Sequence, residues 1–180
     1  SMEFGRNGLY VARRFETGWD QIYYISYDGA TVLRLTDSRL WAATVLKADE
    51  SGGKLYFSAK LDGAPRVTVF SVDIPRTALK ASRRALASSP AIDSRAASAG
   101  ASSALVASSA SSLKALTPLE MNAAGVAFSD DALSFTAYIS NSTTPSRQIR
   151  YNLKRGKIAS SEIISDSTPE NFNASQYALP

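Results

Sequence analysis

The feature that most constrains the fold is a repeating order of short strands and tight turns. From Gly8 to Asp73, runs of β-branched and aromatic residues alternate with turns rich in Gly, Asp and Pro. This pattern is typical of antiparallel strands and disfavours helix. Asp28-Gly29, between the predicted strands 21–27 and 31–36, predicts a hairpin turn because glycine accepts the positive φ that such turns need.

The same order of strands and turns occurs about three times along the chain. The rounds span residues 8–36, 40–117 and 123–165, and Leu35-Thr36 near the end of the first is repeated as Leu116-Thr117 at the end of the second. Rounds of about 40 residues with four strands each match the blades of a β-propeller better than the strands of a sandwich. The sequence therefore predicts an all-β fold of about three antiparallel blades. The first blade is expected to be incomplete and to lack its opening strand.

Segments of the three rounds are similar in residue type. Residues 54–59 resemble residues 133–138, and residues 23–28 resemble residues 69–73 and 150–153. These similarities support blades built on one plan.

An abrupt change of composition interrupts the second round. Residues 81–112 are mostly alanine and serine and include no aromatic residue, which predicts a low-complexity insertion at 76–112 between the third and fourth strands of that round. Good helix formers at 77–87 predict a short helix there, and a second helix is expected at 101–111. A loop is the alternative for both, because the cost of closing a loop rises slowly with its length.

Composition excludes most catalytic chemistry. The chain has no histidine and no cysteine, so it cannot build a Ser-His-Asp triad, a cysteine nucleophile, a disulfide or a thiolate metal site. We expect no catalytic, cofactor-binding or metal-binding residue and no cofactor. The net charge is +4, but the basic residues, including the Arg13-Arg14 and Arg83-Arg84 pairs, are scattered, so no nucleic-acid partner is expected.

Three local patterns have both a chemical and a structural interpretation. Residues 100–104 loosely resemble a nucleophile elbow but have no partner base, and Asp130-Asp131 is expected to be a hairpin turn rather than a cation site. The third pattern is a set of aromatic side chains that could form a binding surface, for which core packing is expected instead: Trp19, Tyr23, Tyr24 and Tyr27.

Several short motifs together point to a known family. Residues 15–23 contain Gly18-Trp19, and residues 126–131 form a Phe-Ser-x-Asp strand and turn. Both are similar to segments of the dipeptidyl peptidase IV-like proteins of the prolyl oligopeptidase superfamily. Further motifs follow in the family's order at Asp28-Gly29, residues 34–36, Trp41, residues 53–59, residues 142–145 and residues 177–180.

The resemblance implies a role without catalysis in this chain. It places the chain in the carboxy-terminal part of the N-terminal propeller, with residues 166–180 as a linker toward a hydrolase domain that holds the catalytic triad. The family's paired glutamates that bind a substrate amino terminus have no counterpart here. The implied function is to enclose the active-site cavity of a serine dipeptidyl peptidase and restrict access of peptide substrates. The alternative is a stand-alone propeller-like interaction module without peptidase activity.

The remaining expectations concern partners and surroundings. A piece of a propeller leaves unpaired strand edges, so we expect self-association through a blade edge or the insertion. Asn141 and Asn173 each match the glycosylation acceptor pattern. No signal for a compartment is visible, and Ser1-Met2 has the character of a tag remnant ahead of an internal boundary.

Overall fold

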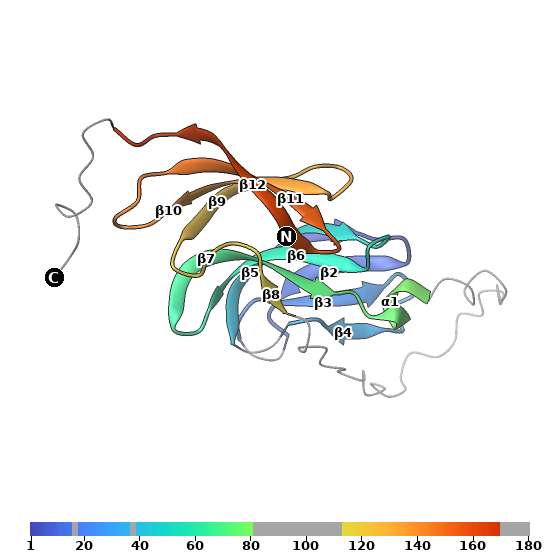
Figure 1. Cartoon of the computed structure of the whole chain (residues 1–180). Coiled ribbons are helices and arrows are strands. Elements are labelled where there is room, and N and C mark those ends of the chain that lie inside the picture. The colour runs from blue at the N-terminus through green and yellow to red at the C-terminus, as the bar shows by residue number, and fades with distance from the viewer. Residues whose placement is uncertain (16–17, 37–38, 81–112, 170–180) are drawn as a thin grey trace, which may run out of the picture.

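The computed structural model describes residues 1–15, 18–36, 39–80 and 113–169 of the 180-residue chain. Within these ranges, twelve strands form three four-stranded antiparallel sheets, which we call the first, second and third blades. The blades are stacked in chain order (Figure 1). They are propeller-like and do not close into a ring in the described part of the chain. The predicted all-β fold of about three blades is confirmed.

Each blade runs from its first strand at one edge to its fourth strand at the other. The first blade contains β1 (Met2–Phe4), β2 (Gly8–Arg13), β3 (Gln21–Ser26) and β4 (Val32–Arg34). The second contains β5 (Leu40–Asp49), β6 (Lys54–Leu61), β7 (Ala64–Asp73) and β8 (Lys114–Ala115). The third contains β9 (Asn122–Phe128), β10 (Ser134–Ser140), β11 (Arg147–Lys154) and β12 (Lys157–Asp166).

The prediction that the first blade lacks its opening strand is wrong. β1 pairs with β2 in the register Met2↔Val11 to Phe4↔Leu9, so the first blade has four strands. A three-residue strand is too short to give a periodic signal in the sequence. Only its pairing with β2 identifies it.

The connection between the third and fourth strands of the second blade contains the Ala/Ser-rich segment. β7 ends at Asp73, and its partner β8 begins at Lys114. One helical turn, α1 (Arg76–Lys80), follows β7. The rest of the helix expected at 77–87 and the helix expected at 101–111 lie outside the described residues.

The repeated Leu-Thr pair has the same structure in the first two blades. In the first blade, the Leu35 N–H donates to the Ile22 carbonyl (2.8 Å), and the Ile22 N–H donates to Thr36 Oγ1 (2.9 Å). In the second blade, Leu116 and Thr117 make the same two bonds to Val69, at 2.7 and 3.0 Å. The hydroxyl thus replaces a strand partner where the fourth strand ends. The repeat is therefore structural as well as compositional.

The same serine–aspartate hydrogen bond closes one hairpin turn in the first blade and one in the third. Ser26 Oγ donates to Asp28 Oδ1 (2.5 Å), and Ser129 Oγ donates to Asp131 Oδ1 (2.6 Å). In both turns a backbone N–H two residues beyond the aspartate donates to the same oxygen. The serine hydrogen bond is the main cause that lowers the pKa of each aspartate. The hairpin turns predicted at Asp28-Gly29 and Asp130-Asp131 are both confirmed.

Two hydrophobic clusters hold the blades together. One lies between the first and second blades and includes Tyr24 and Phe57, and the other lies between the second and third blades and includes Tyr56 and Phe135. These four side chains are at most 1% exposed. Since β6 contributes Phe57 to one cluster and Tyr56 to the other, the second blade is buried on both faces.

Equivalent hydrogen bonds define how the first two blades align, and they match Ile22 with Val69. The resemblance between residues 23–28 and 69–73 did not fix this register, because the first segment is one residue longer than the second. Register matters because a one-residue shift reverses which face of a sheet each side chain occupies. The observed register places Ile22 and Val69 on the face that looks toward the following blade.

The tight turn between β11 and β12 gives a first prediction. Lys154 pairs with Lys157, and the two residues between them, Arg155 and Gly156, have φ of 53° and 70°. Asn-Gly is the preferred pair in such a two-residue turn because asparagine tolerates positive φ better than arginine. We expect Arg155→Asn to raise the free energy of unfolding by about 0.5 kcal/mol.

Urea denaturation measures this change as a higher midpoint with an unchanged slope. Lys154→Asn is the matched control, since Lys154 lies in the strand beside the turn. An equal gain from the control, or no gain from Arg155→Asn, would contradict the assignment of the turn.

Candidate functional site

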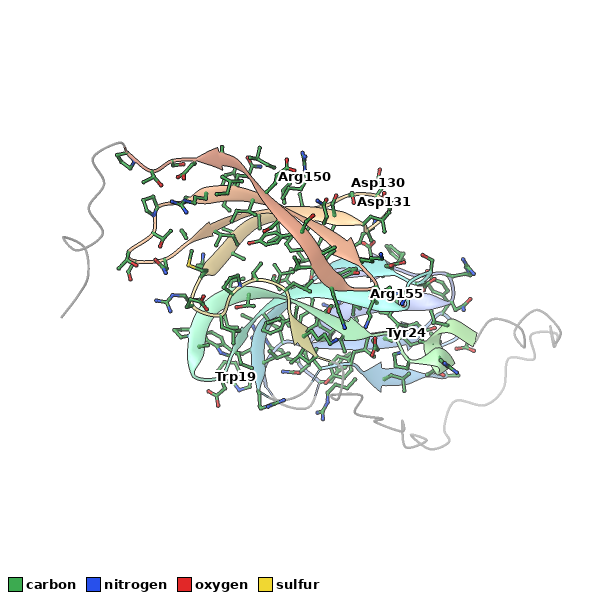
Figure 2. The ribbon with its side chains drawn as sticks, viewed as in Figure 1. Trp19, Tyr24, Asp130, Asp131, Arg150 and Arg155 are labelled. Carbon is green, nitrogen blue, oxygen red and sulfur yellow. The ribbon has the colours of Figure 1, made fainter. Side chains whose placement is uncertain are left out.

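A cavity between the first and second blades is the best candidate for a binding site. It has a volume of about 490 Å³ and contains both tryptophans of the chain, Trp19 and Trp41. Its other lining residues are Arg39, Leu61, Asp62, Gly63, Ala64 and Pro65. Figure 2 shows Trp19 at the end of the blades away from Asp130 and Asp131. The Trp19–Trp41 pocket, as we call it, therefore lies beside the loops that join β2 to β3 and β6 to β7.

The loop between β2 and β3 presents Trp19 to the pocket. Gly18 has φ of 73°, in the region that favours glycine, so the chain turns just before the tryptophan. Arg14 Nε pairs with Asp20 Oδ1 at 3.0 Å and brackets the loop. The Trp19 side chain is 57% exposed. The loop therefore holds Trp19 at the surface, and the side chain is not part of the core.

The first strand of the second blade positions Trp41. Trp41 pairs with Lys60 across β5 and β6, and the register shifts directly after it, at Ala42, which has φ of 52°. This irregularity has the character of a β-bulge, which re-aims side chains near the end of a strand. Lys60 Nζ lies 4.6 Å from the centre of the Trp41 ring, a cation–π contact. The two tryptophan rings are 6.2 Å apart with an angle of 57° between their planes.

The polar groups of the pocket are few and opposite in charge. Arg39 and Asp62 both line it, and the Asp62 N–H donates to the Arg39 carbonyl at 2.7 Å. In the described ranges, no group of three or more His, Cys, Asp or Glu residues could hold a metal ion. The pocket can thus bind a ligand by stacking and by charge, and the described residues of its lining include no serine, threonine, cysteine, histidine or lysine.

The aromatic side chains that were expected in the core divide into two pairs. Tyr23 and Tyr24 are buried, as expected, but Trp19 and Tyr27 are each 57% exposed, so the expectation is wrong for these two. Trp19 lies in a loop and Tyr27 in a turn, where the alternation of strand faces no longer applies. The Tyr27 hydroxyl donates to the Gly5 carbonyl at 2.8 Å.

A second, smaller cavity lies at the opposite end, between the second and third blades. It has a volume of about 290 Å³, and its lining includes Asp49, Asp131 and Arg155. Both carboxylates are engaged by their own turns: Asp49 accepts from Ser51 Oγ and the Gly52 N–H, and Asp131 accepts from Ser129 and Leu133. Asp49 and Asp131 therefore stabilise hairpin turns.

Glu50 connects the first two blades at that same end. The Arg6 N–H donates to both carboxylate oxygens of Glu50, each with an N···O distance of 3.0 Å, and the Tyr10 hydroxyl donates to Oε1 at 3.2 Å. Burial, followed by the negative charge of Glu50, raises the pKa of Tyr10. Glu50 therefore joins the β1–β2 loop to the β5–β6 turn, a structural role.

The other sequence candidates are not brought to the pocket. Asn141 is half-buried, and its Nδ2 atom, which would carry a glycan, lies 3.0 Å from Met121 Sδ. The serine-rich residues 100–104, Asn173 and the Arg83-Arg84 pair lie outside the described residues. Arg13 and Arg14 are exposed.

Comparison with known proteins gives one family. Residues 2–146 match the family model described as "Dipeptidyl peptidase IV (DPP IV) N-terminal region". The matched range includes the first two blades, the Trp19–Trp41 pocket and the first two strands of the third blade, β9 and β10. A search of the described residues for a helix long and apolar enough to cross a membrane finds none.

Proposed function

The chain belongs to the dipeptidyl peptidase IV N-terminal region family, and we propose that it is the non-catalytic propeller part of a serine-type dipeptidyl peptidase. In the parent enzyme it encloses the active-site cavity and admits only short or unstructured peptide ends. The single observation that carries the proposal is the match of residues 2–146, which coincides with propeller-like blades.

The arrangement of the blades supports enclosure. The first strands of successive blades adjoin, β1 with β5 and β5 with β9. In a propeller, such strands surround a central channel. Short peptides can pass along a channel of this kind, whereas folded chains cannot.

The lack of catalysis is tested with the chain alone. Nucleophilic hydrolysis by serine needs a base, and this chain contains no histidine to supply one. We expect the purified chain to release no p-nitroaniline from Gly-Pro-p-nitroanilide above the rate in buffer. The control is any serine dipeptidyl peptidase under the same conditions. Turnover that copurifies with the chain and scales with its concentration would contradict the proposal.

The enclosing role is tested in the parent enzyme. A free Xaa-Pro peptide and a folded protein that carries the same two residues at its amino terminus are offered separately. We expect rapid cleavage of the peptide and little cleavage of the folded protein. Equal rates on both substrates would contradict restricted access.

A stand-alone interaction module is the second candidate function. The observation that favours it is the Trp19–Trp41 pocket, which presents a largely exposed tryptophan and whose described lining includes no serine, cysteine or histidine. The two candidates differ in whether a hydrolase domain accompanies the blades.

We also propose that the isolated chain self-associates through the edge of the third blade. β12 is the outermost strand there, and in the described part of the chain no strand pairs with its other side. Ile163 and Ile164 are 55% and 42% exposed on it. A long, exposed edge strand with apolar side chains favours pairing with another chain.

Light scattering coupled to size-exclusion chromatography measures this association. We expect a mass that rises with concentration for the unmodified chain and a smaller rise for Ile163→Lys, because edge lysines oppose strand pairing. Leu119→Lys adds the same charge at an exposed position outside the strands and is the control. A monomer at all concentrations would refute the proposal.

A further inference from the structure

The second and third blades can be aligned through a pair of stacked aromatic rings in each. Phe57 pairs with Phe70 across β6 and β7, and Phe135 pairs with Tyr151 across β10 and β11. Both ring pairs are stacked and lie on the face that packs on the preceding blade. Because side chains alternate along a strand, the neighbouring residues in both blades lie on the opposite face, which looks away from the preceding blade.

The central position of that opposite face is apolar in two blades and charged in the third. Ile22 in the first blade and its equivalent Val69 in the second are 0% exposed and pack toward the blade that follows. The third blade has Arg150 at this position, and its side chain is exposed. Arg150 Nη1 lies 3.2 Å from Oε1 of Glu162, its partner on β12.

The position two residues further along the same strand changes in the same way. Tyr24 in the first blade and Ser71 in the second each donate a hydrogen bond to a backbone carbonyl between the third and fourth strands of the following blade, at 3.2 and 3.3 Å. The third blade has Asn152 there, and its Nδ2 atom donates to Ser160 Oγ in its own blade at 3.0 Å. A group that joins two blades elsewhere is therefore satisfied within one blade here.

The rest of this face of the third blade, which we call its outer face, is also mainly polar. Its other side chains on β10 and β11 are exposed or partly exposed: Ser134, Thr136, Tyr138, Ser140, Gln148 and Lys154. Another sheet placed on the outer face would strip water from the Arg150–Glu162 pair, and such desolvation is costly unless new polar partners replace the water. Terminal repeats of stacked proteins have polar outer faces, because only inner repeats are covered on both sides.

We propose that the outer face of the third blade is a stop that ends blade stacking. Neither a further blade nor a second copy of the chain finds an apolar surface there, and contacts with this face are polar and hydrated. The same rows of the second blade carry Val69 and Ser71, and that face does receive a blade. The stop does not depend on the parent being a peptidase.

Removing the charged pair from the outer face tests the stop. The background is Ile163→Lys, which suppresses the edge association proposed above, and the test variant adds Arg150→Val and Glu162→Gln. We expect sedimentation velocity to give an association constant at least about tenfold higher than that of the background, because the outer face then carries an apolar residue where the second blade has one. An unchanged association constant would overturn the proposal. If circular dichroism shows that the test variant does not fold, Thr136→Val in the same background takes its place under the same criterion, since Thr136 pairs with Arg150.

A second ion pair across the same two strands is the matched control. Arg147 Nε lies 2.9 Å from Asp166 Oδ2, but Arg147 alternates with the outer-face residues and lies on the opposite face of β11. In the same background, Arg147→Val with Asp166→Asn should therefore leave the association constant close to that of the background. Adding Thr136→Lys to the test variant should return the association constant to the background value, because the lysine puts a charge back on the outer face. Equal rises from both ion-pair variants, or a rise that Thr136→Lys does not reverse, would overturn the assignment to this face.

Discussion

Replacing Phe135 with alanine is expected to lower the free energy of unfolding by about 3–5 kcal/mol, one of the largest single effects in this chain. The Phe135 side chain is 1% exposed. It stacks on Phe128 with ring centres 4.9 Å apart and on Tyr151 at 4.8 Å, and Phe128 stacks in turn on Tyr56 at 4.8 Å. Removing Phe135 breaks this row of rings, which links the third blade to the second.

Urea unfolding followed by circular dichroism measures the loss. Tyr138→Ala is the matched control, because Tyr138 lies on the same strand but is 45% exposed on the opposite face. We expect the control to lose less than about 1 kcal/mol. Similar losses from both variants would show that the third blade does not pack on the second through this face.

Raising the pH above 10 is expected to destabilise the chain through its buried tyrosines. Burial, followed by the charge of Asp49, raises the pKa of Tyr56 to about 12, and burial is also the main cause that raises the pKa of Tyr10, Tyr24 and Tyr151. A tyrosine whose pKa is higher in the folded than in the unfolded state contributes its full stability below pH 10. That contribution is lost as the pH rises through the folded-state value.

The size of this loss can be measured for Tyr56. Between pH 10 and about 12 the loss is of the order of 1 kcal/mol for each pH unit. Urea midpoints of Tyr56→Phe should therefore fall less between pH 8 and pH 11 than those of the unmodified chain. Tyr138→Phe, which changes an exposed tyrosine, should follow the unmodified chain. If the urea midpoint of Tyr56→Phe fell as much between pH 8 and pH 11 as that of the unmodified chain, the burial of a titrating hydroxyl at this position would be contradicted.

Repeated short motifs made the blades predictable from the sequence. Leu35-Thr36 and Leu116-Thr117 make the same hydrogen bonds in two blades because a threonine hydroxyl can end a strand in only a few ways. The turns at Asp28 and Asp131 were also predictable, since an aspartate two residues after a serine closes both. Turns and strand ends of this kind depend on only a few adjacent residues.

Register and surface placement were not predictable in the same way. Residues 23–28 resemble residues 69–73 by type, but the segments differ in length by one residue, so the resemblance does not say which residues are equivalent. The hydrogen bonds match Ile22 with Val69. Adjacent apolar residues of similar type hide the register, although a shift of one residue exchanges the faces of a strand. β1 was not predicted because a strand of three residues is too short to show an alternating sequence pattern. Only its hydrogen bonds to β2 define it.

The candidate site was the least visible feature in the sequence. Trp19 and Trp41 are 22 positions apart and belong to different blades, so only the packing of one blade on the next brings them together. Trp19 was expected in the core because alternate residues of a blade strand face opposite sides and both faces of a middle blade are buried. The signal that could have pointed to the surface is Gly18, since a glycine directly before an aromatic residue in a loop permits a turn that carries the ring away from the sheet.

We propose above that these blades belong to a serine dipeptidyl peptidase whose catalytic groups lie in another domain. The most direct test is to sequence the gene beyond the codon for Pro180. We expect an open reading frame for an α/β-hydrolase domain, with a Gly-x-Ser-x-Gly elbow followed in order by the aspartate and the histidine of a triad. A stop codon directly after Pro180, or a following domain without that elbow, would contradict it and would favour a stand-alone interaction module.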